Sequence, residues 1–344
     1  MPTVLESLNT SLQDVMGQDQ RVYIIGEDIL DPYGGAFKVT SGLSSSFPKR
    51  VITTPISEAG LVGIAAGMAL RGFRPVVEIM FGDFFTLIAD QLINHIAKFR
   101  WMYNEKVNVP IVIRTPMGGR RGYGPTHSQS LEKLYLGIPG IRILSPCTIG
   151  DPGKLLTQAI LDDDNPVLFI ENKLLYLLDL RSEESLAEFS IRDDKGNGFG
   201  YDLLLPVSYA PTYTLSLADS PSPKITITAY GYMAEIALEA VLRLAYEEEI
   251  FTELVIPTQL APFKLKPIIN SVRKTHKLVV VEEGGRTLGW GTEILARGTE
   301  ILGKDLEYAY RVAGLDLPIP ASAQIEESIL PGVQDIIAAV RKSF

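Results

Sequence analysis

The chain has 344 residues, of which 46% are apolar and 21% charged; this is typical of a globular protein with sizeable cores and excludes a disordered or fibrous chain. Its 32 basic and 41 acidic residues give a net charge of −9, which argues against nonspecific nucleic-acid binding. A single cysteine, Cys147, excludes an internal disulfide. Because no apolar run could span a bilayer and the N-terminus lacks a signal or transit pattern, we expect a cytoplasmic protein with no membrane partner.

Short β-branched runs alternate with amphipathic segments in the first half of the chain, which predicts a mostly parallel sheet covered by helices. The expected strands are 22–25, 51–53, 76–79, 110–114, 142–145 and 167–171. An N-terminal helix comes first, and further helices are expected at 57–71, 84–102, 130–136 and 151–162.

A turn-rich and Ser/Pro-rich stretch then breaks this rhythm, and we expect residues 181–224 to form a linker or insertion. A second α/β pattern follows, with strands expected at 225–229, 252–256 and 278–282 and helices at 234–248, 266–275, 289–297 and 334–341. The pattern predicts an α/β protein with two domains, residues 1–180 and a smaller domain of residues 225–344.

Glu58 stands at the start of the predicted helix 57–71, directly after a strand and a proline turn. Most first-turn glutamates only complement the helix dipole. This helix also contains Gly60, Gly63 and Gly67, each a weaker helix former than alanine. Such glycines indicate the close approach of another backbone, so we expect Glu58 at the mouth of a tight helix interface.

His127 lies in a Gly-rich loop that follows the predicted strand 110–114. Ligands of parallel sheets bind at the carboxyl ends of strands, so a functional role is as plausible here as a structural one. Arg120 and Arg121 of the same loop are either solvated charges or a clamp for a carboxylate or phosphate. The residues by themselves give an α/β protein with Glu58 and His127 as candidate catalytic groups.

Several sequence blocks are more specific than these patterns. In TTPISEAGLVGIAAGMALRG, Glu58 is followed at fixed spacing by Gly63-Ile64 and Gly67-Met68, and RTPMGGRRGYGPTHSQS ends in a His-Ser-Gln-Ser motif. With VVVEEGGRTLGWGTEILAR and others, these blocks resemble the β subunit of the thiamine-diphosphate-dependent 2-oxo acid dehydrogenase E1 component, of the pyruvate and branched-chain type. The resemblance covers nearly the whole chain and implies a transketolase-like pyrimidine-binding domain followed by a transketolase C-terminal-like domain.

This resemblance implies roles for individual residues. Glu58 would hydrogen-bond N1′ of the cofactor's aminopyrimidine, and Phe84 would pack on that ring beside Leu87, where pyruvate-type members tend to have Gln. His127 would take part in proton transfer and meet the lipoyl group. A structural K⁺ site would use backbone carbonyls of Ile111, Ala159, Ile160, Asp163 and Asn165.

The resemblance also implies the partners. The diphosphate and Mg²⁺ would be held by a separate α subunit, so that each active site lies between chains of an α2β2 heterotetramer and this chain is active only with its partner. The reaction would be the decarboxylation of a 2-oxo acid, with transfer of the acyl group to a lipoyl E2 acyltransferase.

Two alternatives stay open. The same cofactor chemistry would also serve a biosynthetic enzyme that takes a ketose phosphate or 2-oxo acid and loads a carrier protein, with Arg120 and Arg121 as the anion clamp. These arginines are not expected in the family, and the strand end VIPTQLAPF departs from its usual acidic pattern. The other alternative is a noncatalytic assembly subunit, against which the intact Glu58 and His127 argue.

Overall fold

The computed structural model describes residues 1–194 and 209–344, which form two compact units. The first unit contains Met1–Met117 and Leu134–Leu180. The second contains Gly118–Lys133 together with the described residues after 180. The loop that carries His127 therefore belongs to the second unit, although it interrupts the first in sequence. Residues 195–208 of the predicted linker lie outside the described residues.

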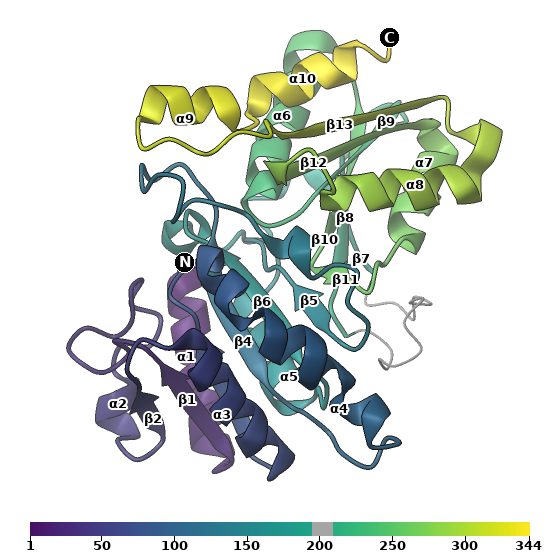
Figure 1. The fold of residues 1–344 in the computed structure, drawn as a ribbon. Coiled ribbons are helices and arrows are strands. Elements are labelled where there is room, and N and C mark those ends of the chain that lie inside the picture. Colours follow the sequence, from purple (N-terminus) through teal and green to yellow (C-terminus); the bar gives the residue numbers. More distant parts are fainter. Residues whose placement is uncertain (195–208) are drawn as a thin grey trace. The chain divides into compact units, whose positions relative to one another are not determined.

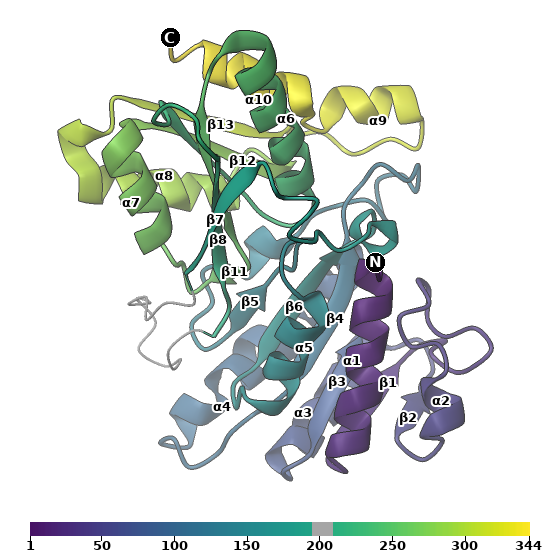
Figure 2. The same ribbon diagram turned by 180° about the vertical axis from the view of Figure 1, so that it is seen from behind.

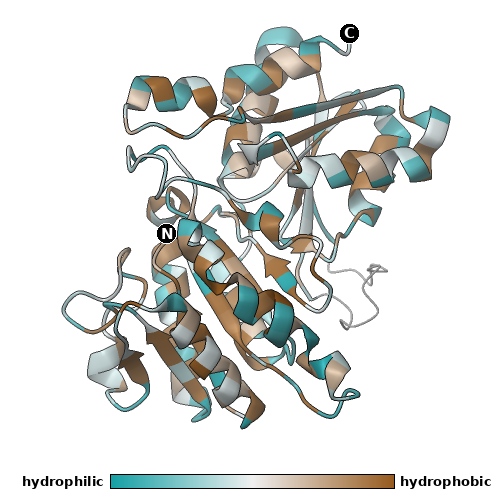
Figure 3. Cartoon of the chain, in the orientation of Figure 1, coloured by the Kyte–Doolittle hydropathy of each residue, from teal (hydrophilic) through white to brown (hydrophobic). Residues whose placement is uncertain are grey.

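The first unit is built on a parallel sheet in which the strands of this unit follow the order β5-β6-β4-β3-β1-β2. These strands are hydrophobic along most of their length (Figure 3) and mostly buried, as expected for a sheet covered on both faces. Their bounds are β1 Val22–Gly26, β2 Val51–Thr53, β3 Arg74–Glu78, β4 Val112–Met117, β5 Arg142–Leu144 and β6 Val167–Asn172. All six strands predicted here are confirmed, with shifts of at most three residues at their ends.

Helices cover both faces of this sheet. Helices α1 (Val4–Gln18) and α5 (Pro152–Leu161) pack against each other on one face (Figure 2). Helices α3 (Glu58–Leu70) and α4 (Ala97–Met102) lie over the other face (Figure 1), and the short α2 (Leu43–Ser46) precedes β2. In the described residues, no helix combines the length and the apolar character needed to cross a membrane.

The segment 84–102 was predicted as one helix, and that prediction is wrong. It consists of a 3₁₀ helix at Gly82–Ile88, a π-helical turn at Gln91–Ile96 and then α4. Side chains three residues apart eclipse each other in a 3₁₀ helix. This period places the fully buried Phe85 and Ile88 together on the inner side, and leaves Phe84 and Leu87 together on the outer side.

The second unit has a mixed sheet of order β13-β12-β9-β10-β8-β7, in which β9, β10, β12 and β13 are parallel. The predicted linker supplies its two antiparallel edge strands, β7 (Phe189–Asp194) and β8 (Thr212–Leu217). Most of β7 is solvent-exposed, so its polar sequence carried no strand signal. The other strands of this sheet are β9 Ile225–Ala229, β10 Thr252–Pro257, β12 Lys277–Gly285 and β13 Tyr308–Gly314, and the short β11 (Gln259–Ala261) is not part of it.

Helices α6 (Tyr232–Glu248) and α10 (Val333–Arg341) pack together on one face of this sheet, and α7 (Lys266–Thr275) and α8 (Trp290–Leu302) pack on the other (Figure 1). A further helix, α9 (Ala323–Ile329), precedes α10. The helix predicted at 130–136 is reduced to a single 3₁₀ turn at Glu132–Leu134. The buried side chain of Glu132 is bound by Tyr230 across the unit, which is a tertiary constraint that the local sequence does not reveal.

Candidate functional site

Glu58 is the first residue of α3, at the edge of the first sheet where its parallel strands end. The residue is only 7% exposed, and its carboxylate accepts no hydrogen bond from the described part of the chain. Glu27, directly after β1, is its acidic neighbour, and Glu27 Oε1 accepts a hydrogen bond from the backbone N–H of Ser57 at 3.0 Å. Burial raises the pKa of Glu27, and the nearby charge of Glu58 adds to this shift.

The outward face of α3 is made of glycine and aliphatic side chains. Gly63 and Gly67 are exposed, and a Cβ atom added at either would meet no atom within 4 Å. Ile64, between them on this face, is 63% exposed. Since no polar side chain follows Glu58 in this helix, its outer face is a poor match for water and a good match for a closely packed second helix.

Phe84 and Leu87 share the outer side of the 3₁₀ helix at Gly82–Ile88. Phe84 is half-buried and packs edge-to-face on Phe81 at 5.8 Å between ring centroids, whereas Leu87 is 54% exposed. A Cβ atom at Gly82 would lie 2.2 Å from the Met117 side chain, so this glycine lets the segment approach β4. Glu58, Phe84 and Leu87 all belong to the first unit.

The residues expected to form a K⁺ site lie largely around one arginine. Arg74 Nη1 donates to the backbone carbonyls of Ile160 and Asp163, at 2.9 and 3.0 Å, so these two oxygens converge. The Ile111 carbonyl accepts from the backbone N–H of Val167 as part of the sheet. Ala159 lies in α5, next to Ile160 in sequence.

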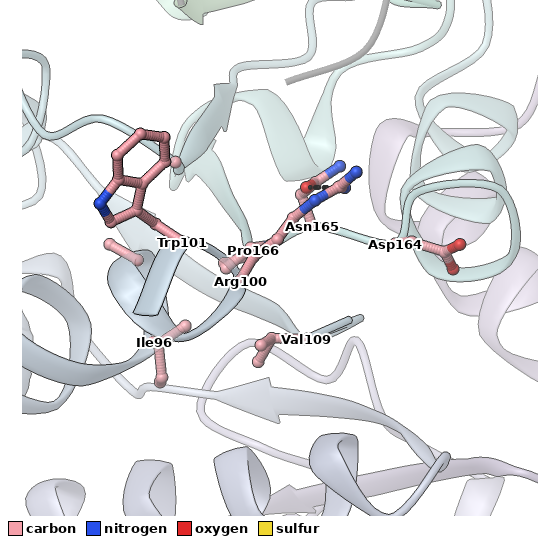
Figure 4. Close-up of a pocket in the computed structure, with 9 residues that line it drawn as sticks. Ile96, Arg100, Trp101, Val109, Asp164, Asn165 and Pro166 are labelled. Carbon is pink, nitrogen blue, oxygen red and sulfur yellow. Dashed lines mark hydrogen bonds between the residues drawn. The ribbon is translucent and has the colours of Figure 1, made fainter. Parts of the chain in front are cut away.

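Asn165 hydrogen-bonds to the same group of residues. Its Nδ2 donates to Asp163 Oδ1 at 3.0 Å, and its Oδ1 accepts from Arg100 Nη1 at 3.0 Å. Arg100 and Asn165 lie side by side (Figure 4). Both line a pocket of about 10 Å³, to which Trp101 also contributes. The structure therefore brings Ile160, Asp163 and Asn165 together, near buried or half-buried cationic side chains.

The Gly-rich loop of the second unit carries the other candidates. His127 is half-buried, with Nδ1 at 3.0 Å from Thr126 Oγ1. Arg120 has a left-handed backbone (φ +66°), and its Nη2 donates to the Pro331 carbonyl at 2.6 Å. Arg121 is exposed and is therefore the member of the arginine pair that faces solvent.

Three residues of possible functional importance, all glutamates, were not identified from the sequence. Glu27 lies beside Glu58, and Glu283 and Glu326 bind the loop of His127 through backbone amides. Glu27 and Glu283 do fall within the blocks that carry the family resemblance, but nothing in those blocks indicated their contacts.

A buried acidic cluster lies where β9 and β12 end in the second unit. Tyr230 donates to Glu132 Oε1 at 2.6 Å and packs edge-to-face on Trp290 at 5.1 Å. Glu282 is fully buried; Gly291 donates its N–H to Oε1 at 3.2 Å. Burial raises the pKa of Glu282 to about 8, and the charge of Glu132 adds to this shift.

The pH dependence of stability should report this cluster. Between the ordinary pKa of 4.5 and the raised value of about 8, the folded chain keeps a proton on Glu282 that the unfolded chain releases. The free energy of unfolding should therefore fall as the pH rises through this window. Glu282→Gln should flatten the fall in urea titrations at several pH values, whereas Glu300→Gln, at an exposed position of α8, should not. Equal slopes in all three proteins would contradict the assignment.

Comparisons with known proteins agree with this arrangement. Residues 1–177 match the model for "Transketolase, pyrimidine binding domain" and residues 216–336 that for "Transketolase, C-terminal domain". The chain is 38% identical over 347 residues to the mitochondrial pyruvate dehydrogenase E1 component subunit beta of Drosophila melanogaster, covering 99% of this chain and 88% of that protein. It is 34% identical over 348 residues to the corresponding subunit of Rickettsia bellii, covering 99% and 98%.

A solved structure described as a split-gene transketolase, an inactive beta4 tetramer, superposes with a TM-score of 0.73 at 20% sequence identity. The match covers 99% of this chain and 98% of that one. At this identity the likeness establishes the transketolase-like two-domain α/β fold, as predicted from the sequence.

Proposed function

Because this chain belongs to the β subunits of 2-oxo acid dehydrogenase E1 components, we propose that it supplies the pyrimidine side of a thiamine-diphosphate site. Together with an α subunit, it would decarboxylate a 2-oxo acid and pass the acyl group to a lipoyl E2 acyltransferase. The observation that carries the proposal is the Glu58 carboxylate, which is buried yet accepts no hydrogen bond from the described residues of its own chain.

The residues around Glu58 fit such a cofactor. A buried carboxylate that lacks donors needs one from elsewhere, and a protonated ring nitrogen of an aminopyrimidine meets that need. Bound thiamine diphosphate supplies the electron sink for decarboxylation. Glu58 would hold the proton shared with N1′, while Phe84 and Leu87 would cover the ring from the neighbouring 3₁₀ helix and exclude water.

Further residues take supporting roles in this proposal. The acidic Glu27 lies beside Glu58, and burial together with the charge of Glu58 raises the pKa of Glu27. We assign His127 to proton transfer and to contact with the lipoyl group, and the solvent-facing Arg121 to attraction of an anionic substrate. Mg²⁺ and the diphosphate would be held by the α subunit.

The outer face of α3 supports the heteromeric assembly. Its exposed Gly63 and Gly67 leave room for a second backbone, and the exposed Ile64 between them offers apolar contact area. We propose that a helix of the α subunit packs here, within an α2β2 heterotetramer. This contact would also seal the site of Glu58, which begins the same helix.

Three finer points belong to the same proposal. The K⁺ site stays a prediction: the carbonyls of Ile160 and Asp163 converge, but Arg74 Nη1 already donates to both, so a guanidinium takes the place that a cation would have there. The compartment we propose is the cytoplasm. Two domain boundaries, at residues 180/181 and 224/225, remain predictions.

The donor and acceptor distinguish this function from the biosynthetic alternative. We propose a 2-oxo acid as donor, with pyruvate the first to test because the similar proteins are named for it. Arg120 is bound to the Pro331 carbonyl, which weakens the case for a paired-arginine clamp on a ketose phosphate. Turnover of the reconstituted α and β chains with a phosphorylated ketose, and with no 2-oxo acid, would favour the alternative.

Glu58→Gln tests the catalytic assignment. Glutamine preserves the size of the side chain but cannot share a titrating proton, so kcat of the reconstituted complex should fall about 100- to 10,000-fold. Glu293→Gln is the matched control, because Glu293 is also a first-turn glutamate but lies in α8, and it should leave kcat unchanged. Unchanged turnover in Glu58→Gln would leave a noncatalytic assembly subunit as the better reading.

Gly63→Ala and Gly67→Ala test the assembly, because the two effects have opposite signs. In the isolated chain each alanine meets no neighbour, so helix propensity should stabilise folding by about 0.5–1 kcal/mol. In the complex the added methyl groups would hold the partner helix away, and affinity for the α subunit should fall about tenfold. Gly298→Ala in α8, also without a close neighbour but buried, should stabilise the chain and leave affinity unchanged. Unimpaired assembly of the α3 variants would contradict the proposed contact.

A further inference from the structure

The backbone of the loop 118–130 is bound by two glutamates from distant parts of the second unit. Glu283, near the end of β12, accepts the N–H of Gly119 at 2.7 Å and the hydroxyl of Ser130 at 3.3 Å through the same oxygen, Oε1. One contact lies at each end of the loop segment that contains His127. Because Glu283 is 5% exposed, these bonds are shielded from water.

Glu326 of α9 uses both carboxylate oxygens on the same loop. Its Oε1 accepts the N–H of Arg120 at 2.6 Å, and its Oε2 accepts the N–H of Gly122 at 3.2 Å. Arg120 and Gly122 both have left-handed backbones, at φ +66° and +67°. Backbone N–H groups around left-handed residues form a concave anion site, and here the buried Glu326 carboxylate fills it.

The shape of the loop depends on this close approach. A Cβ atom at Gly119 would lie 2.5 Å from the Leu330 side chain and 2.9 Å from Glu326 Oε1, so a larger residue here would require both side chains to shift. A left-handed backbone at a non-glycine residue such as Arg120 costs on the order of 1 kcal/mol and persists only where the surroundings hold it. The charge-assisted hydrogen bonds to Glu326 provide that hold.

We propose that Glu326 and Glu283 are positioning residues for the site. Their carboxylates fix the backbone of residues 119–122 and the Ser130 end, and thereby set where Arg121 and His127 lie. Neither glutamate touches a reacting group. The inference rests on the proposed function only for the role of His127. That the two carboxylates order the loop backbone is a separate property, which can be measured without the cofactor.

Glu326→Gln is the informative variant because glutamine offers one acceptor oxygen where Glu326 uses two. Its NH₂ group would face either the Arg120 or the Gly122 amide, so one charge-assisted bond is replaced by two opposed donors. Glu327→Gln is the matched control, at the next and exposed residue of α9.

The first measurement needs no cofactor and follows trypsin cleavage of the full chain after Arg120 and Arg121. Loss of the hydrogen bonds between Glu326 and the loop should raise this cleavage rate about tenfold in Glu326→Gln and not in Glu327→Gln. Cleavage after the exposed Lys106, in the other unit, should stay unchanged and serves as the internal reference. An unchanged rate after Arg120 and Arg121, or an equal rise after Lys106, would overturn the proposal. If Glu326→Gln does not fold, Glu326→Asp, which keeps the charge on a shorter side chain, takes its place with the same criteria.

The second measurement is a double-mutant cycle on kcat/KM of the α/β complex. Glu326→Gln should lower kcat/KM about tenfold in the wild-type background and less than about twofold in a background that carries both Arg121→Ala and His127→Ala, because its effect passes through these two residues. Equal losses in both backgrounds would show a merely structural role and overturn the positioning claim. If His127→Ala by itself changes nothing, the proposed role of His127 fails, and the trypsin rates still decide whether Glu326 holds the loop.

Discussion

The constraint on which this account depends is the isolation of one carboxylate. Glu58 begins a helix that is otherwise apolar, and it is buried beside the acidic Glu27. A carboxylate in such a place is costly unless something outside the chain supplies a donor. The same helix exposes glycines and an isoleucine to the outside. The carboxylate without a donor and the exposed apolar face of α3 have one common explanation: the chain is part of a larger assembly, and another chain completes the site.

The two units hold their functional groups in different ways. In the first, Glu58 and Phe84 are placed by a helix start and a 3₁₀ helix at the edge of a parallel sheet, so regular secondary structure fixes them. In the second, His127 lies on an irregular loop in which the N–H groups of Gly119, Arg120 and Gly122 donate to Glu283 and Glu326. A loop needs such external acceptors because it lacks the internal hydrogen bonds of a helix or strand. Glu283 and Glu326 thus accept hydrogen bonds from the loop backbone, as neighbouring strands do from each other in the sheet.

Regular elements with strong local signals were predictable from the sequence, and contacts between distant residues were not. The β-branched runs at 22–25 and 167–171 gave β1 and β6 nearly to the residue. The exposed β7 gave no such signal because its sequence is polar on most of its length. Glu58 stood out because it starts a glycine-containing helix, and in the structure it is the first residue of that helix and buried. Glu326, by contrast, is 206 residues from Arg120 in sequence, and a single chain carries no trace of that pairing.

The central claim is that this chain holds only part of a cofactor site, and calorimetric titration of thiamine diphosphate in the presence of Mg²⁺ tests it most directly. The account predicts weak or undetectable binding to the isolated chain, and saturable, tight binding once an equimolar α subunit is added. Tight binding to the isolated chain, unchanged by the second polypeptide, would contradict it.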